Sequence, residues 1–235
     1  MLNIHRLSML MLLLFTLILT ACGNKDKELK EEKKVLLKGK PSDSSYYLAQ
    51  DFFDKGDYSS ALEFHHKQLQ EDLKYYPEVS LEIALDYNNI GLDYDELKNY
   101  EKALEFYLKT MKIDEQTLEQ NSTERSTTYY NVANSYFSLN QYENAIKYYL
   151  KALKIDIYAL SETHEDVWAE HEKLAMSYEK IGKKQMAISY WQKSLSYQTS
   201  LYGQYSQESN ETREKIDALK KSMRQKNVTS RDEKD

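Results

Sequence analysis

Two consecutive stretches decide the fold: Tyr87–Tyr94, with the sequence YNNIGLDY, and Tyr100–Ile113, with the sequence YEKALEFYLKTMKI. In both stretches apolar residues recur at spacings of three and four, which is the pattern of an amphipathic helix. Each stretch has a small residue near its centre, Gly91 in the first and Ala103 in the second. Small residues let two helix axes approach closely. The sequence therefore predicts two helices packed against each other.

This pattern returns every 42 residues along most of the chain. The small residue of the second helix is Ala61, Ala103, Ala145 and Ala187. The apolar and small pair of the first helix is Leu48-Ala49, Ile90-Gly91, Val132-Ala133 and Leu174-Ala175. The aromatic residue that follows this pair is Phe52, Tyr94, Tyr136 and Tyr178. A fixed period of this length indicates a repeat protein, so the sequence predicts an all-α solenoid.

The columns resemble the tetratricopeptide repeat, because the second unit reads Tyr87-x2-Ile90-Gly91-x2-Tyr94 and is followed by Ala103. The resemblance implies a right-handed superhelix of helix pairs. Each unit is eight residues longer than the usual repeat of 34, which is similar to the kinesin-light-chain subclass. The opening of the fourth unit, His164–Val167, is similar to that subclass as well. The predicted units are 42–83, 84–125, 126–167 and 168–200.

The residues after the fourth unit contain no full repeat. One helix is predicted within 201–226, because Ile216, Leu219 and Met223 fall on one face with charged residues around them. The end of a solenoid needs a polar outer side, so we interpret this segment as a capping helix. Residues 227–235 are predicted to be a disordered tail.

The first 41 residues differ in composition from the rest. Leu7–Leu19 is almost wholly apolar and is too short to span a membrane, so 1–21 is predicted to be a signal peptide. It ends in Leu19-Thr20-Ala21-Cys22, which resembles the lipobox of bacterial lipoproteins. That resemblance implies cleavage before Cys22 and acylation of its thiol and amine, with palmitate-like chains as the only covalent group. Residues 22–41 are predicted to be a charged tether.

The predicted signal peptide and the cysteine at its end also imply where in the cell the protein is located. A lipid-anchored protein on a bacterial membrane is expected, and the outer membrane is expected if the host has two, because Gly23 follows the cysteine where the family would use Asp for retention. Two or three acyl chains hold a protein on a membrane stably, whereas one chain holds it weakly.

Composition and spacing exclude most catalytic and metal chemistries. The 235 residues contain one cysteine and six glycines and carry a net charge of −6, which argues against zinc ribbons, phosphate-binding loops and nucleic-acid binding. His164 and His171 are seven residues apart, not the four of a zinc-binding helix. We therefore expect no enzyme, no metal, no cofactor apart from the lipid on Cys22, no nucleic acid and no small-molecule substrate.

A binding surface follows from the helical geometry. Counting 100° per residue, one side of each first helix faces away from the second helix, and in this family that side lines a concave groove. The candidate protein-binding residues there are Tyr47, Gln50, Asn88, Asn89, Tyr130, Asn131, Asn134, Phe137 and Lys173. The asparagines are candidates for binding because asparagine is a mediocre helix former. Its amide can both donate hydrogen bonds to a peptide backbone and accept them. The alternative is that they are tolerated on a solvated face.

The residue types on the groove side limit which kinds of peptide segment it is expected to bind. Tyr46 and Thr127 stand where the family's chaperone-tail binders need cations, so a free C-terminal carboxylate is not expected. Acidic residues suit a basic or neutral segment; they are Asp54, Asp95, Glu96 and Glu179.

Together these features predict a membrane-anchored scaffold or adaptor of the bacterial envelope that binds a protein or peptide in its groove. An immunity or inhibitor lipoprotein that neutralises a toxic envelope-targeting enzyme is the alternative. An accessory subunit of an envelope enzyme is a further, less favoured interpretation, because no nucleophile is evident.

Overall fold

The computed structural model describes residues 44–232, which all belong to the unit Asp43–Asp235. Every regular element in this range is a helix. The helices are α2 (Ser44–Asp54), α3 (Tyr58–Asp72), α4 (Leu81–Glu96), α5 (Tyr100–Thr117), α6 (Thr123–Ser138), α7 (Tyr142–Ala159), α8 (Glu165–Lys180), α9 (Lys184–Tyr202) and α10 (Gln207–Asp232). The predicted signal peptide, the predicted lipidation site Cys22 and the predicted tether lie outside the described residues.

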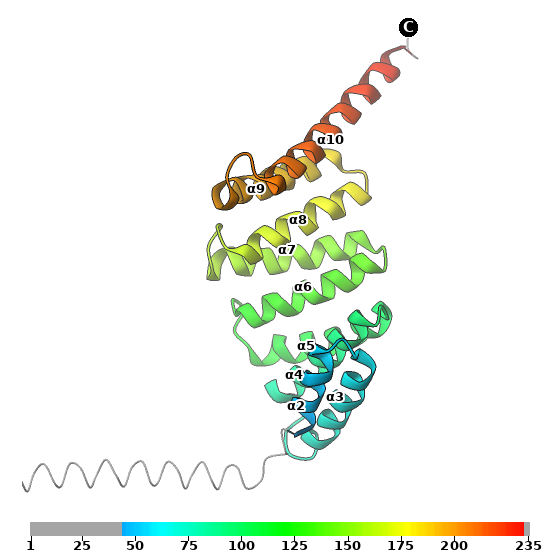
Figure 1. Ribbon diagram of the computed structural model, residues 1–235, viewed down its shortest axis with the longest axis vertical. Helices are drawn as coiled ribbons and strands as arrows, with labels where there is room; N and C mark the ends of the chain where they lie inside the picture. The colour runs from blue at the N-terminus through cyan, green and yellow to red at the C-terminus, as the bar shows by residue number, and fades with distance from the viewer. Residues whose placement is uncertain (1–43, 233–235) are drawn as a thin grey trace, which may run out of the picture. The chain divides into compact units, whose positions relative to one another are not determined.

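Each described helix packs mainly on its neighbours in the chain. The contacts run without interruption from α2 against α3 to α9 against α10. Figure 1 shows the helices following one another in chain order as layers of a stack. Four helix pairs and a final helix are thus arranged as a solenoid, which confirms the predicted all-α repeat architecture. Within the described range no helix is long and apolar enough to cross a membrane.

The turn inside each pair repeats in the backbone. The second residue after each first helix has a positive φ in all four units: Gly56 (76°), Lys98 (59°), Asn140 (60°) and Gly182 (72°). Two of them are glycines, and glycine adopts this conformation without strain. The other two units place a lysine and an asparagine in the same conformation. The position in the repeat therefore fixes the turn.

The pair interior is built around one close approach and one aromatic stack. Gly91 packs against Tyr107 so tightly that a Cβ atom there would lie 2.6 Å from the tyrosine Cε1. Each pair also stacks an aromatic residue of its first helix on one of its second helix at centroid distances of 5.4 to 5.7 Å. The stacked pairs are Phe52–Phe64, Tyr94–Phe106, Tyr136–Tyr148 and Tyr178–Tyr190.

A lysine three residues further along the second helix covers the second ring of each stack. The lysine nitrogens lie 4.3 to 6.0 Å from the ring centroids, within the range of cation–π attraction. These residues are Lys67, Lys109, Lys151 and Lys193. Packing thus accounts for much of the tyrosine content and for one lysine in each unit.

Neighbouring repeats also meet through buried polar side chains with the same period. The last turn of α5 places Asp114 against Thr128 of α6, whose hydroxyl donates to the carboxylate at 2.6 Å. The equivalent contacts one repeat earlier and later are pairs of carboxyl groups, Asp72 with Asp86 and Asp156 with Glu170. Two buried carboxyl groups in hydrogen-bond contact share a proton, because both cannot be charged there.

The C-terminal helix is longer than predicted. Ile216 is buried, and Leu219 and Met223 pack on the same core as Trp191 of α9, which agrees with a capping role. However, α10 continues to Asp232, so the expectation of disorder from residue 227 is wrong for residues 227–232. The reason is that no glycine or proline in this segment interrupts the helix.

Candidate functional site

The candidate site is the groove face, which we define as the side of α4, α6 and α8 that points away from α5, α7 and α9. Its centre is a contact between two repeats. The amide of Asn131 on α6 donates to the side-chain carbonyl of Asn88 on α4 at 3.2 Å. Both side chains are half-buried. Each amide keeps a second polar end, so the pair can offer one acceptor and donors to a ligand backbone.

Of the two other predicted asparagines, Asn134 bonds within the protein and Asn89 is partly buried. The carbonyl of Asn134 accepts a hydrogen bond of 2.6 Å from the Tyr149 hydroxyl. Tyr149 is fully buried, and its ring packs edge-on against Tyr130 at 5.6 Å. The amide nitrogen of Asn89 is buried and has no partner in the described part of the chain. Asn134 and Tyr130 thus help to hold α6 on α7, whereas Asn88 and Asn131 remain the better candidates for binding.

At the C-terminal ends of these helices the groove face has a cavity of about 300 Å³ lined with charge. Lys173 lies 5.9 Å from the Phe137 ring centroid, and burial lowers the pKa of this lysine. Asp95 lines the same cavity, and its pKa is raised by burial and by the neighbouring Glu96. Glu96 and Lys98 line this cavity as well, so two acids and two lysines meet here and their formal charges balance.

At the N-terminal ends the groove face has a second cavity of about 320 Å³ with mainly apolar walls. Leu81 and Leu85 of α4 line it and are about half exposed, at 49% and 52%. Leu118 and Thr127 line it as well, and Asn88 lies at its edge towards the Asn131 contact. Exposed leucines beside a polar pair are suited to an apolar side chain of a bound segment.

The predicted residues therefore divide into two groups. The structure brings Asn88 and Asn131 together, and Asn134, Phe137 and Lys173 together around the charged cavity. Tyr47 and Gln50 make contacts within α2: Tyr47 packs on Tyr46, and Gln50 donates to Asp54 at 2.8 Å.

Sequence reasoning missed the apolar cavity. Leu81 lies just before the second unit and Leu118 lies in the loop after α5, so neither belongs to the columns that define the groove side. Leu85, which does lie on the groove side of α4, was the available signal.

No catalytic arrangement is evident on the groove face. The best-formed acid and base pair in the described residues is His65 Nδ1 with Asp93 Oδ2 at 2.6 Å. These residues are 3% and 0% exposed, so neither can reach a substrate. No cluster of histidine, cysteine or carboxylate side chains within residues 44–232 could hold a metal ion.

Comparison with known proteins agrees with the geometry. Residues 42–116 and 81–157 match the family model for the tetratricopeptide repeat. No curated protein matches the sequence. A crystal structure of a Podosopora anserina putative kinesin light chain with nearly identical TPR-like repeats is 16% identical, with a TM-score of 0.67, and the match covers 80% of this chain and 89% of that one.

Two further solved structures are similar. BtubC (BKLC) from P. vanneervenii is 21% identical, with a TM-score of 0.65 and coverage of 76% of this chain and 71% of that one. The apo form of RapI is 14% identical, with a TM-score of 0.64, and the match covers 86% of this chain but 56% of RapI. At these identities the likeness concerns the fold. The chain therefore carries tetratricopeptide repeats and folds as a tetratricopeptide-repeat solenoid, with structural similarity to kinesin-light-chain-like repeat proteins.

Proposed function

We propose that this protein is a scaffold or adaptor of the bacterial envelope, anchored to the membrane through Cys22, that binds a peptide or protein partner on its groove face. The observation that supports the binding role is the Asn88–Asn131 contact, which lies beside the apolar cavity and on the same face as the charged cavity. An extended segment with an apolar side chain and a nearby polar or charged side chain would match these three features.

The proposed anchor is supported by the leader and by the position of Cys22 at its end. Cys22→Ser is expected to abolish incorporation of a radioactive fatty acid and to release the protein from the membrane fraction, because the serine cannot form the thioether. Label that persists in the serine variant would contradict the anchor, whatever the outcome of the binding experiments.

The binding role is tested by affinity capture from a detergent extract of the host envelope, followed by mass spectrometry. The double variant Asn88→Ala/Asn131→Ala is expected to lose its captured partner by at least about tenfold, because two polar contacts of a typical 0.5–1.5 kcal/mol each are removed. Its far-ultraviolet circular dichroism is expected to match that of the wild type, since both residues are half-buried and point away from the core.

The matched control is Asn144→Ala on α7, an exposed asparagine that donates to Gln141 at 3.0 Å and lies outside the groove face. This variant is expected to capture the partner as the wild type does. Equal capture by all three proteins would move the binding site off the groove face. Capture of a single envelope enzyme whose activity falls on binding would identify an inhibitor instead of a scaffold.

A further inference from the structure

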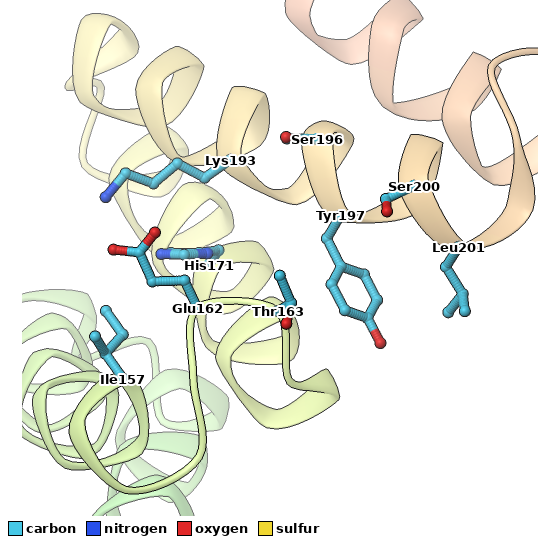
Figure 2. A pocket seen from close by; sticks show the side chains of 9 residues that line it. All are labelled: Ile157, Glu162, Thr163, His171, Lys193, Ser196, Tyr197, Ser200 and Leu201. Carbon is cyan, nitrogen blue, oxygen red and sulfur yellow. The ribbon is translucent and has the colours of Figure 1, made fainter.

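A further cavity, separate from the two on the groove face, lies on the other side of α8. Its volume is about 440 Å³, and it is enclosed by α8, α9, the end of α7 and the loop between α7 and α8. Figure 2 shows the nine side chains that line it. His171 contributes from α8, Lys193 and Tyr197 contribute from α9, and Glu162 contributes from the loop. None of these residues was assigned a role in the groove.

The cavity contains a buried polar atom without a partner. His171 is 7% exposed, and its Nε2 atom has no hydrogen-bond partner within the described residues. Burial and the nearby Lys193 lower the pKa of His171 to about 4, so the ring is neutral at physiological pH. A buried imidazole nitrogen without a partner costs free energy, so its presence beside the cavity is a departure from ordinary packing.

The repeat itself shows what is unusual here. The position of His171 is occupied by Tyr129 in the preceding unit, where a cavity of about 530 Å³ has the same relation to the repeat. The Tyr129 hydroxyl donates to Glu115 at 2.8 Å and accepts from Arg125 at 3.2 Å. One unit later, these two partners are replaced by Ile157 and Val167. The fourth unit has thus lost the polar partners but kept a polar ring.

The charges of the cavity define the ligand. Glu162 supplies a carboxylate and Lys193 an ammonium group, and no ion pair joins them at 4.0 Å or less. Figure 2 shows both charged ends on the same side of the view, beside the His171 ring, with Ser200 and Leu201 on the opposite side. A simple anion would be repelled by Glu162 and a simple cation by Lys193. A molecule that carries both charges satisfies both residues.

We propose that this cavity binds a small zwitterion with an apolar side group, namely a free α-amino acid or a dipeptide. Its carboxylate contacts Lys193 beside the His171 ring, and its ammonium group contacts Glu162. Its side group lies along Tyr197 and Leu201, while the hydroxyl groups of Thr163 and Ser196 line the remaining wall. The volume is within the usual range for a small-molecule site.

Isothermal titration calorimetry on the folded protein tests this. The probes are L-leucine and the dipeptide leucyl-leucine at up to about 10 mM, because ligands of this size bind weakly. N-acetyl-L-leucine lacks the ammonium group and L-leucinamide lacks the carboxylate. Binding of at least one zwitterion is expected, with at least tenfold weaker binding of both analogues. No binding of either zwitterion, or equal binding of an analogue, would overturn the proposal.

Variants assign the binding to this cavity. Lys193→Ala is expected to weaken zwitterion binding at least tenfold, whereas Lys151→Ala, the equivalent change one unit earlier, is expected to leave it unchanged. His171→Tyr places the residue of the preceding unit in the cavity and is expected to block binding with unaltered circular dichroism. Asn88→Ala/Asn131→Ala is expected to bind normally, since it concerns only the groove face. Wild-type affinity in Lys193→Ala would also overturn the proposal.

Discussion

The carboxyl group of Asp86 shows how a single residue ties stability to pH. Burial and contact with Asp72 raise its pKa to about 8, and burial with Asp156 raises that of Glu170 to about 10. Both groups are therefore protonated in the folded protein near neutral pH but ionised in the unfolded chain. The folded state binds more protons, so stability falls as pH rises from about 4 towards these values.

Asp86→Asn is expected to stabilise the protein at alkaline pH, because the neutral amide can donate to Asp72 at every pH. At pH 8 the gain should be roughly 1–2 kcal/mol, or about 2–8 °C in the melting temperature. The gain should shrink towards pH 4, where the carboxyl is already about half protonated in the unfolded chain. Thermal melts followed by circular dichroism between pH 4 and pH 8 measure this difference.

The control for this prediction is Asp51→Asn, which changes an exposed carboxylate that pairs with Lys55 at 2.6 Å. Its melting temperature should follow the wild-type pH dependence. Parallel curves for Asp86→Asn and the wild type across this range would show that Asp86 is ionised in the folded protein.

At the residue scale the sequence predicted positions better than roles. Counting 100° per residue placed Asn88, Asn131 and Asn134 on one side of the first helices. That count depends only on the helical period. The use of Asn134 as an acceptor for Tyr149, and the loss of partners for His171, depend on side chains that the packing of distant repeats brings together. Periodicity carries no information about such partners.

The C-terminal helix shows what an end element does for a solenoid. Lys215 of α10 lies 4.4 Å from the Trp191 ring centroid, and Lys184 of α9 donates to Ser222 at 2.8 Å. Ile216 is 4% exposed on the same side of the helix. Helix α10 therefore covers the apolar side of the last helix pair, which would otherwise face water.

A chain that ends after Tyr205 is expected to lose this cover. Its melting temperature should fall by at least about 5 °C, since burial of three large apolar side chains is worth several kcal/mol. It should also bind the dye ANS more strongly than the full chain does. A chain that ends after Gln225 keeps Ile216, Leu219 and Met223 and should melt like the full chain. If both truncations melt alike, α10 does not act as a cap.

Helix identities were predictable, and helix ends were less so. The columns of Ala61 and its equivalents located every second helix, and the glycines at 56 and 182 located two of the turns. Lys98 and Asn140 adopt the same left-handed backbone without a sequence signal, because their neighbours in the repeat impose it. The end of α10 was misplaced for a similar reason, since charge alone does not terminate a helix.

For the described part of the molecule, the fold could be inferred because a repeat presents the same evidence four times. The first unit has a serine, Ser45, where the second unit has Tyr87. This difference did not obscure the pattern of the other three units. The candidate sites could not be inferred to the same extent. Each of them depends on a departure from the repeat, such as the exposed leucines beside α4 or the histidine in place of Tyr129, and a departure occurs only once.

The contacts along the stack join each helix chiefly to the next one in the chain. Such contacts close only short loops, so little chain entropy is lost before the first stabilising interactions form. We expect rapid folding without a long search for distant partners. A helix pair that has left the ribosome already contains its own aromatic stack and lysine, and can serve as the template on which the next pair is deposited during synthesis.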